Sequence, residues 1–312
     1  MGKAIRDAYG EALVKYGATN QNIVVLDADL SGSTKSALFG AKYPDRFFNV
    51  GIAEANMTAM AAGFASVGKI PFVNTFTVFL TTLGLLATRT LGSYSKLPIK
   101  LMGAYGGLSD AFDGPTHHAL EDIAIMRALP NFKVYVASDA VQTDWLVRHA
   151  LEENGPMYVR LSRDKMADLY DETTNFQDGK GFIVRPGSDA TIVACGMMVG
   201  NSLQAADILE KEGLSVRVVD MFCIKPLDTE LICRCAKETG AIVSAEEHNI
   251  IGGLGGAVAE ALCAGNAAVP MGFIGTQDCH AECGPYKTLL QAYGLDAEAI
   301  ANKVRETVAK KK

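Results

Sequence analysis

Two short segments of the sequence carry side chains that can do acid–base or polar binding chemistry. In the first, residues 49–57, a short apolar run ends and a helical pattern begins with the carboxylate of Glu54. A glutamate in the first turn of a helix is favoured by the helix dipole, so a structural role accounts for it about as well as a functional one. The functional alternative is a carboxylate at the carboxyl edge of a parallel sheet, where ligands bind in open α/β folds.

The second segment, residues 110–118, contains two acids followed by two adjacent histidines. We do not expect a metal site, because adjacent imidazoles at a helix start point in different directions and no cysteine or third histidine lies at ligand spacing. We favour a loop that presents His117 and Asp113 to a polar substrate. Gly114–Pro115 is typical of a turn, and Thr116 is suited to cap a following helix. A purely structural cap is the alternative.

Two further patterns are predicted to be structural. Residues 251–257 imitate a dinucleotide fingerprint, but no acid ends a following strand about 20 residues later, so we interpret them as close packing of helix on sheet. Residues 278–283 suggest a metal cluster on paper, but without a second Cys/His pair we expect a loop. The sequence also lacks the G-D-G…Asn pattern that holds a magnesium diphosphate, as well as P-loop, G-x-S-x-G and H-E-x-x-H motifs.

Composition and charge narrow the class of protein. The 312 residues are 49% hydrophobic and 21% charged, as in a globular protein, and the net charge of −6 argues against non-specific nucleic-acid binding. No apolar run reaches the ~18 residues of a membrane span, so no membrane partner is expected. The first ten residues do not have the pattern of a signal peptide, and the seven cysteines are scattered. We therefore expect a reduced, cytoplasmic protein.

Short apolar runs alternate with helical stretches along the whole chain. Continuous apolar runs separated by helices predict parallel strands that are buried on both faces. The predicted strands are 23–26, 47–52, 70–73, 99–104, 134–137, 157–161, 191–195, 216–221, 241–245 and 271–274. The predicted helices include 54–67, 120–128, 140–152, 201–211, 228–237 and 256–262. The fold class is therefore α/β, with two three-layer domains.

One segment, Asp164–Asp189, interrupts this alternation. It is rich in Asp, Gly and Pro and has little periodic apolar content, which indicates a linker. We expect a first domain at 1–165 with a mostly parallel sheet, a linker at 166–189, and a smaller α/β domain at 190–312.

With these segments in order, the chain resembles the C-terminal half of transketolase, as found in organisms that split the enzyme into two subunits. The resemblance runs from about Ile5 to Glu306. It is carried by the segments 51–63 (GIAEANMTAMAAG), 75–79 (TFTVF), 113–117 (DGPTH), 161–163 (LSR), 219–221 (VDM) and 252–256 (GGLGG). It implies a pyrimidine-binding domain followed by the C-terminal domain of that family.

The resemblance also implies a cofactor and a partner. In the family, thiamine diphosphate lies between two domains, one of which binds the diphosphate and metal while the other holds the aminopyrimidine ring. This chain resembles the second kind. A separate N-terminal subunit is then expected to bind the diphosphate with Mg²⁺ or Ca²⁺, with no metal held by this chain. We expect a homodimer of this chain within an α2β2 assembly.

The resemblance assigns the aminopyrimidine to three residues. Glu54 matches the carboxylate that shares a proton with ring nitrogen N1′, which favours removal of the proton from C2 of the thiazolium. Phe76 and Phe79 match aromatic positions around the ring, with ordinary core phenylalanines as the alternative. The family often has a tyrosine three residues after the second phenylalanine, where this sequence has Thr82.

The resemblance assigns the substrate to four more residues. His117 and Asp113 match residues that meet the sugar hydroxyls near the reacting carbons, and Arg163 and Arg6 match arginines that hold the terminal phosphate. A histidine that many members carry twelve residues before His117 is replaced here by Tyr105. The terminal anion of the sugar is therefore left open.

The expected function is transfer of a two-carbon ketol unit from a ketose phosphate to an aldose phosphate, within the pentose phosphate pathway, and only together with the N-terminal subunit. One alternative is a transketolase for another sugar, such as a sulfo-sugar or apulose phosphate. A second is the β subunit of a 2-oxo acid dehydrogenase, which has the same two domains. A third is a scaffold or regulatory homologue without turnover, against which the presence of Glu54 argues.

Overall fold

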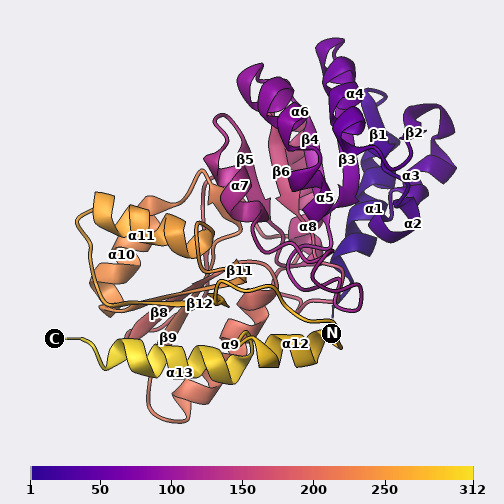
Figure 1. Cartoon of the computed structure of the whole chain (residues 1–312). Coiled ribbons are helices and arrows are strands. Elements are labelled where there is room, and N and C mark those ends of the chain that lie inside the picture. The colour runs from indigo at the N-terminus through magenta and orange to yellow at the C-terminus, as the bar shows by residue number, and fades with distance from the viewer. Residues whose placement is uncertain (1, 312) are drawn as a thin grey trace.

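A seven-stranded sheet forms the centre of the N-terminal lobe in the computed structural model, which describes residues 2–311 (Figure 1). The strand order is β10-β5-β6-β4-β3-β1-β2, and every pair is parallel except β10 with β5. The strands are β1 (Ile23–Asp27), β2 (Phe47–Asn49), β3 (Ile70–Phe76), β4 (Lys100–Ala104), β5 (Lys133–Val136), β6 (Met157–Arg160) and β10 (Cys223–Lys225).

Helices cover both faces of this sheet, and the alternation of side chains along β1 shows how. Ile23 and Val25 pack with α1 (Ile5–Gly17) and α8 (Ala140–Glu152) on one face. Val24 and Leu26 pack on the other face with α4 (Glu54–Ser66) and α7 (Asp122–Ala128). Shorter helical segments complete the lobe: α2 (Ser31–Thr34), α3 (Ala37–Lys42), η1 (Pro44–Arg46), α5 (Thr77–Thr82), α6 (Leu85–Ala87) and η2 (Thr88–Tyr94).

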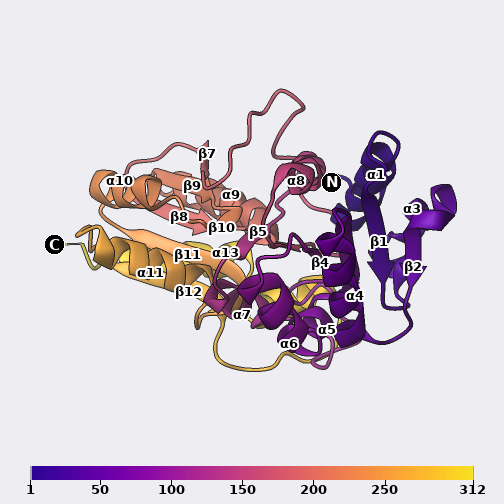
Figure 2. The same cartoon turned by 90° about the horizontal axis from the view of Figure 1, so that it is seen from above.

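The C-terminal lobe has a five-stranded sheet with the order β12-β11-β8-β9-β7, in which only β7 is antiparallel. Its strands are β7 (Phe182–Arg185), β8 (Ala190–Ala194), β9 (Val216–Asp220), β11 (Ile242–Asn249) and β12 (Met271–Thr276). Its helices are α9 (Met197–Glu210), α10 (Thr229–Thr239), α11 (Leu254–Ala264), α12 (Tyr286–Ala292) and α13 (Ala297–Val308). Figures 1 and 2 show α10 and α11 on one side of this sheet and α9 and α13 on the other. The predicted α/β fold with two layered domains is confirmed.

Two strands differ from the pattern expected from the sequence. Strand β7 lies inside the segment expected to be a linker and pairs with β9. Strand β10 belongs by sequence to the second half of the chain, yet it pairs with β5 at the edge of the N-terminal sheet. Runs of three or four residues carry too little periodicity to be recognised, and an antiparallel pairing partner is set by tertiary contacts. A strand from the second half of the chain therefore forms the edge of the N-terminal sheet.

Within residues 2–311 no helix combines the length and apolarity needed to cross a bilayer.

Candidate functional site

A cavity of about 310 Å³ opens at the carboxyl edge of the N-terminal sheet. Its lining comes from segments that follow β1, β2, β3 and β4, which is where ligands bind in parallel α/β sheets. The lining residues are Ala28, Asp29, Leu30, Ile52, Glu54, Phe76, Phe79, Leu83 and His117. The cavity therefore combines a carboxylate and an imidazole with mainly apolar walls, the usual composition of a small-molecule site.

Glu54 is the first residue of α4, and only 4% of it is exposed to solvent. Its Oε1 atom accepts a hydrogen bond from Oγ1 of Thr75 at 3.3 Å. The chain turns from β2 into this helix through Gly51, whose φ of +74° lies in the left-handed region that glycine adopts without strain. Glu54 is therefore a buried carboxylate at the carboxyl edge of the sheet. The sequence predicted this position, because an apolar run is followed there by the start of a helix.

Two phenylalanines and a histidine form the aromatic wall of the cavity. Phe76 ends β3 and Phe79 lies in α5, and their ring centroids are 6.1 Å apart with an interplanar angle of 22°. The His117 ring meets Phe79 nearly edge-on, at 5.2 Å and 78°. Oγ1 of Thr116 lies 2.9 Å from Nδ1 of His117. Aromatic faces beside a carboxylate suit a flat heterocycle that has ring nitrogens at its edge.

A pair of arginines lies next to this wall and meets at Tyr105. The Tyr105 ring stacks on Phe76 with centroids 4.4 Å apart and planes inclined by 21°. Nη1 of Arg6 donates a hydrogen bond to the Tyr105 hydroxyl. The guanidinium carbons of Arg6 and Arg163 lie 5.6 and 5.3 Å from the centroid of the tyrosine ring. Two guanidinium groups on one side of the cavity can bind an anion.

Acidic residues border the same region. Asp110 is buried, and its Oδ1 lies 3.5 Å from Nη1 of Arg163. Burial, with a smaller contribution from the charge of Asp113, raises the pKa of Asp110 to about 6, against the opposing charge of Arg163. Asp113 is exposed and does not line the cavity. The structure therefore brings Glu54, Phe76, Phe79 and His117 together and places Arg6 and Arg163 beside them, whereas Asp113 is exposed outside the lining.

The loop after β1 contributes lining residues that the sequence did not single out. Asp27, the last residue of β1, is fully buried and its carboxylate accepts hydrogen bonds from Leu30 N at 2.6 Å, Thr34 Oγ1 at 2.8 Å and Ser36 Oγ at 2.7 Å. Burial raises the pKa of this carboxyl. These bonds fix the backbone of residues 28–30 against the cavity. The sequence signal that could have indicated this part of the site is the pair of acids at positions 27 and 29, directly after an apolar run.

The other two motifs have structural partners. Backbone N–H groups of Leu254 and Gly255 donate to the buried carboxylate of Glu246 at 2.6 and 2.8 Å. The N–H groups that would face a phosphate in a dinucleotide site are therefore bonded to a side chain of the protein itself. Residues 278–283 form a loop before α12, as expected. Within residues 2–311, one group of side chains has metal-ligand spacing, His149, Glu153 and Asp178, and both carboxylates there pair with the ammonium of Lys133.

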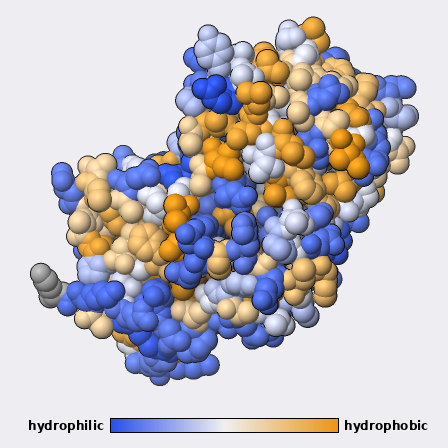
Figure 3. Space-filling view, in the orientation of Figure 1, coloured by the Kyte–Doolittle hydropathy of each residue, from blue (hydrophilic) through white to orange (hydrophobic). Residues whose placement is uncertain are grey.

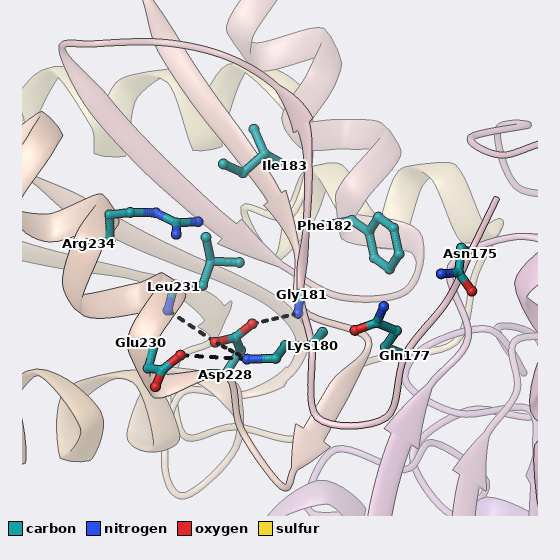
Figure 4. A pocket seen from close by; sticks show the side chains of 10 residues that line it. All are labelled: Asn175, Gln177, Lys180, Gly181, Phe182, Ile183, Asp228, Glu230, Leu231 and Arg234. Atoms are coloured by element: carbon teal, nitrogen blue, oxygen red, sulfur yellow. Dashed lines mark hydrogen bonds and ion pairs between the residues drawn. The ribbon is translucent and has the colours of Figure 1, made fainter.

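A second cavity, of about 420 Å³, lies between residues 175–183 and α10 (Figure 4). Asp228 occupies its centre, where Oδ2 accepts a hydrogen bond from Gly181 N at 3.3 Å. Nζ of Lys180 lies 3.8 Å from Asp228 and 3.7 Å from Glu230. The lysine of this second cavity thus forms ion pairs with its acids. In the first cavity, the carboxylate of Glu54 and the imidazole of His117 form no ion pair with each other.

Exposed apolar side chains gather around the first cavity. Figure 3 shows apolar residues on the face formed by α4, α5 and α6. Ile52 is 83% exposed, Leu83 57%, Leu86 73% and Tyr94 84%, and Ile52 and Leu83 also line the cavity. Large exposed apolar residues beside a site are typical of a protein–protein contact.

Comparison with known proteins is decisive for the family. Residues 1–167 match the transketolase pyrimidine-binding domain, and residues 179–300 match the transketolase C-terminal domain. The chain belongs to the transketolase family. This family depends on thiamine diphosphate.

The most informative relatives are proteins of the same length. The chain is 42% identical over 310 residues to a protein of Methanocaldococcus jannaschii described as a transketolase C-terminal section, covering 99% of this chain and 97% of that one. It is 37% identical to a 6-deoxy-6-sulfo-D-fructose transketolase subunit of a Clostridium species, over 98% of this chain and 95% of that subunit. A solved structure, a split-gene transketolase described as an inactive β4 tetramer, superposes with a TM-score of 0.93 at 44% identity over the whole of both chains.

Single-chain transketolases are about twice as long. Human transketolase is 36% identical over 98% of this chain, but the chain spans only 49% of the human protein. The resemblance to the transketolase family and the two expected domain types are thus confirmed, and the chain spans about half the length of the single-chain relatives that it matches.

Proposed function

We propose that this chain is the C-terminal subunit of a split transketolase, which transfers a two-carbon ketol unit from a ketose to an aldose together with a separate N-terminal subunit. The observation that carries the proposal is the cavity that joins Glu54, Phe76, Phe79 and His117 in a chain corresponding to half of a transketolase. Neither half of such a site is complete without the other.

The cavity fits the aminopyrimidine end of thiamine diphosphate. When bound, this cofactor supplies the carbon nucleophile of the reaction. Phe79 and Phe76 present aromatic surface to a flat ring and exclude water from it. Glu54, buried at the start of α4, holds a proton at ring nitrogen N1′, and Thr75 orients the carboxylate from its other side. We assign the diphosphate end of the cofactor, with its Mg²⁺ or Ca²⁺, to the N-terminal subunit.

The substrate faces His117 and the loop before it. His117 lines the cavity beside the two phenylalanines, where it would bind the carbonyl or hydroxyl oxygen of the donor sugar and move its proton. The exposed Asp113, four residues earlier in the same loop, would meet the C2 hydroxyl of the acceptor.

Arg6 and Arg163 bind the terminal anion of the sugar. Tyr105 lies between them, where many family members carry a histidine, so the site has two permanent cations and a neutral phenol. A ketose phosphate is the first candidate donor. A sulfonated ketose is the second, because a sulfonate carries one negative charge at neutral pH and needs fewer cations than a phosphate, and because one similar protein is described as a sulfo-sugar transketolase subunit.

The partner covers the apolar face around Ile52, Leu83 and Leu86. We propose an α2β2 assembly in which two copies of this chain associate and each completes its cofactor site with an N-terminal subunit. The β4 assembly described for the split-gene relative is one of β chains alone and is described as inactive, which agrees with a requirement for the second subunit.

The test is an activity assay of the complex with its N-terminal subunit. Xylulose 5-phosphate with ribose 5-phosphate as acceptor is compared with pyruvate and an electron acceptor. Ketol transfer supports the proposal. Oxidative decarboxylation of pyruvate without ketol transfer would instead make the chain a 2-oxo acid dehydrogenase β subunit, and neither activity, with thiamine diphosphate bound, would favour a regulatory homologue.

A further inference from the structure

The loop that carries Tyr105, Asp113 and His117 runs from the end of β4 to the start of α7 and is closed at its base. Gly107 and Ala119 exchange backbone hydrogen bonds, from Gly107 N to Ala119 O at 3.0 Å and from Ala119 N to Gly107 O at 3.1 Å. Residues 108–118, here called the catalytic loop, project from this pair toward the cavity. The loop contains turns, such as the one closed by His117 N and Gly114 O at 2.9 Å, but no helix or strand, so contacts from outside the loop are needed to set its position on the protein.

The C-terminal lobe supplies such contacts, although none of its residues lines the cavity. Oε1 of Glu247, in β11, accepts hydrogen bonds from Leu108 N at 2.8 Å and from the Tyr286 hydroxyl at 2.9 Å. Two further bonds from this lobe hold the loop and the residue that follows it: Gly284 N to Ala111 O at 3.1 Å and Asn249 N to Leu120 O at 2.8 Å. Arg160, in β6 of the N-terminal lobe, adds a bond from Nη2 to Ala119 O at 2.9 Å.

Glu247 and Arg160 form the buried base on which the loop is seated. They are 5% and 3% exposed, and Nη2 of Arg160 also donates to the backbone oxygen of Glu247 at 2.8 Å. Gly107, at φ +68°, has no room for a β-carbon because the Glu247 side chain fills that space. A buried carboxylate is costly unless its acceptors are used, and here one oxygen accepts two hydrogen bonds.

We propose that Glu247, with Tyr286, is a positioning residue for the transferase reaction: it fixes the base of the catalytic loop so that His117 is held against the cofactor cavity. The C-terminal lobe thereby contributes to turnover without touching substrate or cofactor. The expected effect on turnover rests on the proposed function, whereas the expected effect on the mobility of the loop rests on the fold alone.

The proposal separates two groups of site residues. Glu54, Phe76 and Phe79 lie on α4, β3 and α5 and make no hydrogen bond to Glu247 or Tyr286. His117 and Asp113 lie on the loop. Loosening the base is therefore expected to lower kcat, because small displacements of catalytic groups cost roughly 10²-fold in rate, while the affinity for thiamine diphosphate is preserved.

The chain offers a matched control in the neighbouring residue of the same strand. Glu246 is also a buried glutamate whose carboxylate accepts two backbone hydrogen bonds, but these come from the start of α11 and not from the loop. Glu246→Gln therefore perturbs a comparable buried acceptor without touching the catalytic loop.

The experiment has two arms, with Glu247→Ala, Tyr286→Phe and Glu246→Gln compared with the unmodified chain. The first arm measures amide hydrogen exchange of the chain alone, so it does not depend on activity. Peptides covering 106–118 should exchange roughly tenfold faster in Tyr286→Phe and faster still in Glu247→Ala, with the strands β1 and β3 unchanged. The second arm measures kcat, substrate KM and thiamine diphosphate affinity in the complex with the N-terminal subunit.

We expect kcat to fall roughly tenfold in Tyr286→Phe and up to about 100-fold in Glu247→Ala, with cofactor affinity within about twofold and Glu246→Gln unaffected. Glu247→Gln, which keeps an acceptor oxygen, should recover most of the loss. Normal exchange of 106–118 and normal kcat in Tyr286→Phe would overturn the proposal, even if Glu247→Ala does not fold. Uniformly faster exchange across both lobes would also overturn it. If the unmodified complex shows no ketol transfer, the proposed function fails while the exchange arm still decides whether Glu247 orders the loop.

Discussion

The ring of Phe76 stacks on the ring of Tyr105 with centroids 4.4 Å apart. This contact joins two parts of the site, because Phe76 lines the cavity proposed for the aminopyrimidine and Tyr105 contacts both arginines proposed for the terminal anion. Tyr105 adopts a φ of +60°, which is uncommon for a bulky residue and is held here by Phe76 and by the two cationic side chains.

Replacing Tyr105 by histidine should change the preference for the terminal anion. A histidine can take up a proton beside Arg6 and Arg163, which favours the doubly charged phosphate over the singly charged sulfonate, so kcat/KM for a phosphorylated ketose should rise roughly tenfold relative to a sulfonated one, the value of one charge-assisted hydrogen bond. Steady-state kinetics of the complex with both donors measures the ratio. Tyr105→Phe is the control, since it keeps the stacked ring and adds no donor. An unchanged ratio of the two kcat/KM values in Tyr105→His would show that this position does not discriminate between the terminal anions.

Glu54→Gln should lower kcat by at least about 100-fold, because an amide does not hold a proton at ring nitrogen N1′ as a carboxyl group does. Its similar size keeps the cavity shape, so binding of thiamine diphosphate by the complex, followed by fluorescence or calorimetry, should weaken much less. Glu260→Gln, at an exposed acid in α11, serves as the control. Full turnover in Glu54→Gln would revive the interpretation of this chain as a scaffold.

His117→Ala should reduce kcat roughly 10²- to 10⁴-fold, the usual contribution of a general acid or base. The ring is half-buried and packs edge-on against Phe76 and Phe79, so the folded chain should keep its melting temperature within a few degrees. His280→Ala, at an exposed histidine, is the matched control and should behave as the unmodified complex. Equal rates for the two variants would exclude His117 from the chemistry.

Stability should depend on pH through Glu247. Burial raises the pKa of this carboxyl to about 7, against the opposing charge of Arg160 and the hydrogen bonds from Tyr286 and Leu108, while Asp164 adds to the rise. A carboxyl whose folded pKa lies above its unfolded value contributes stability below the unfolded pKa and loses it as pH rises through the folded pKa. Relative to Glu247→Gln, the unmodified chain should lose about 2 kcal/mol of unfolding free energy between pH 5 and pH 8.

Urea unfolding of the two proteins across this pH range measures that difference. Other buried acids, such as Asp110 and Asp220, whose pKa values are each raised to about 6, are present in both proteins and cancel. Parallel pH curves for the two proteins would contradict the assignment.

The N-terminal site could be read from the sequence because its signals are local. Glu54 follows an apolar run directly, and Phe76 and Phe79 follow another, so the rule that ligands bind at the carboxyl edge of parallel strands brings them together. The family resemblance then supplied their roles. Asp27 gave a comparable signal, an acid at the end of a buried strand, but its part in shaping the loop depends on hydrogen bonds from Leu30, Thr34 and Ser36 that no spacing reveals.

The contacts between the lobes could not be read in the same way. Leu108 and Glu247 are 139 residues apart in sequence, and their hydrogen bond depends on how the two sheets meet. The one local sign was a charged run, Glu246–His248, in a strand that is otherwise apolar, since buried charges require partners. Strand β10 was missed for a related reason: its three residues pair with β5 from the other lobe.

In the proposed function, this chain holds one end of a cofactor whose diphosphate is bound by another polypeptide. The most direct measurement is ketol transfer from xylulose 5-phosphate to ribose 5-phosphate, with thiamine diphosphate and Mg²⁺, by this chain alone, by an N-terminal subunit carrying the G-D-G…Asn pattern alone, and by the two mixed. We predict activity only in the mixture, saturating at equal amounts of the two chains. Turnover by this chain alone, with tight binding of the intact cofactor, would contradict it.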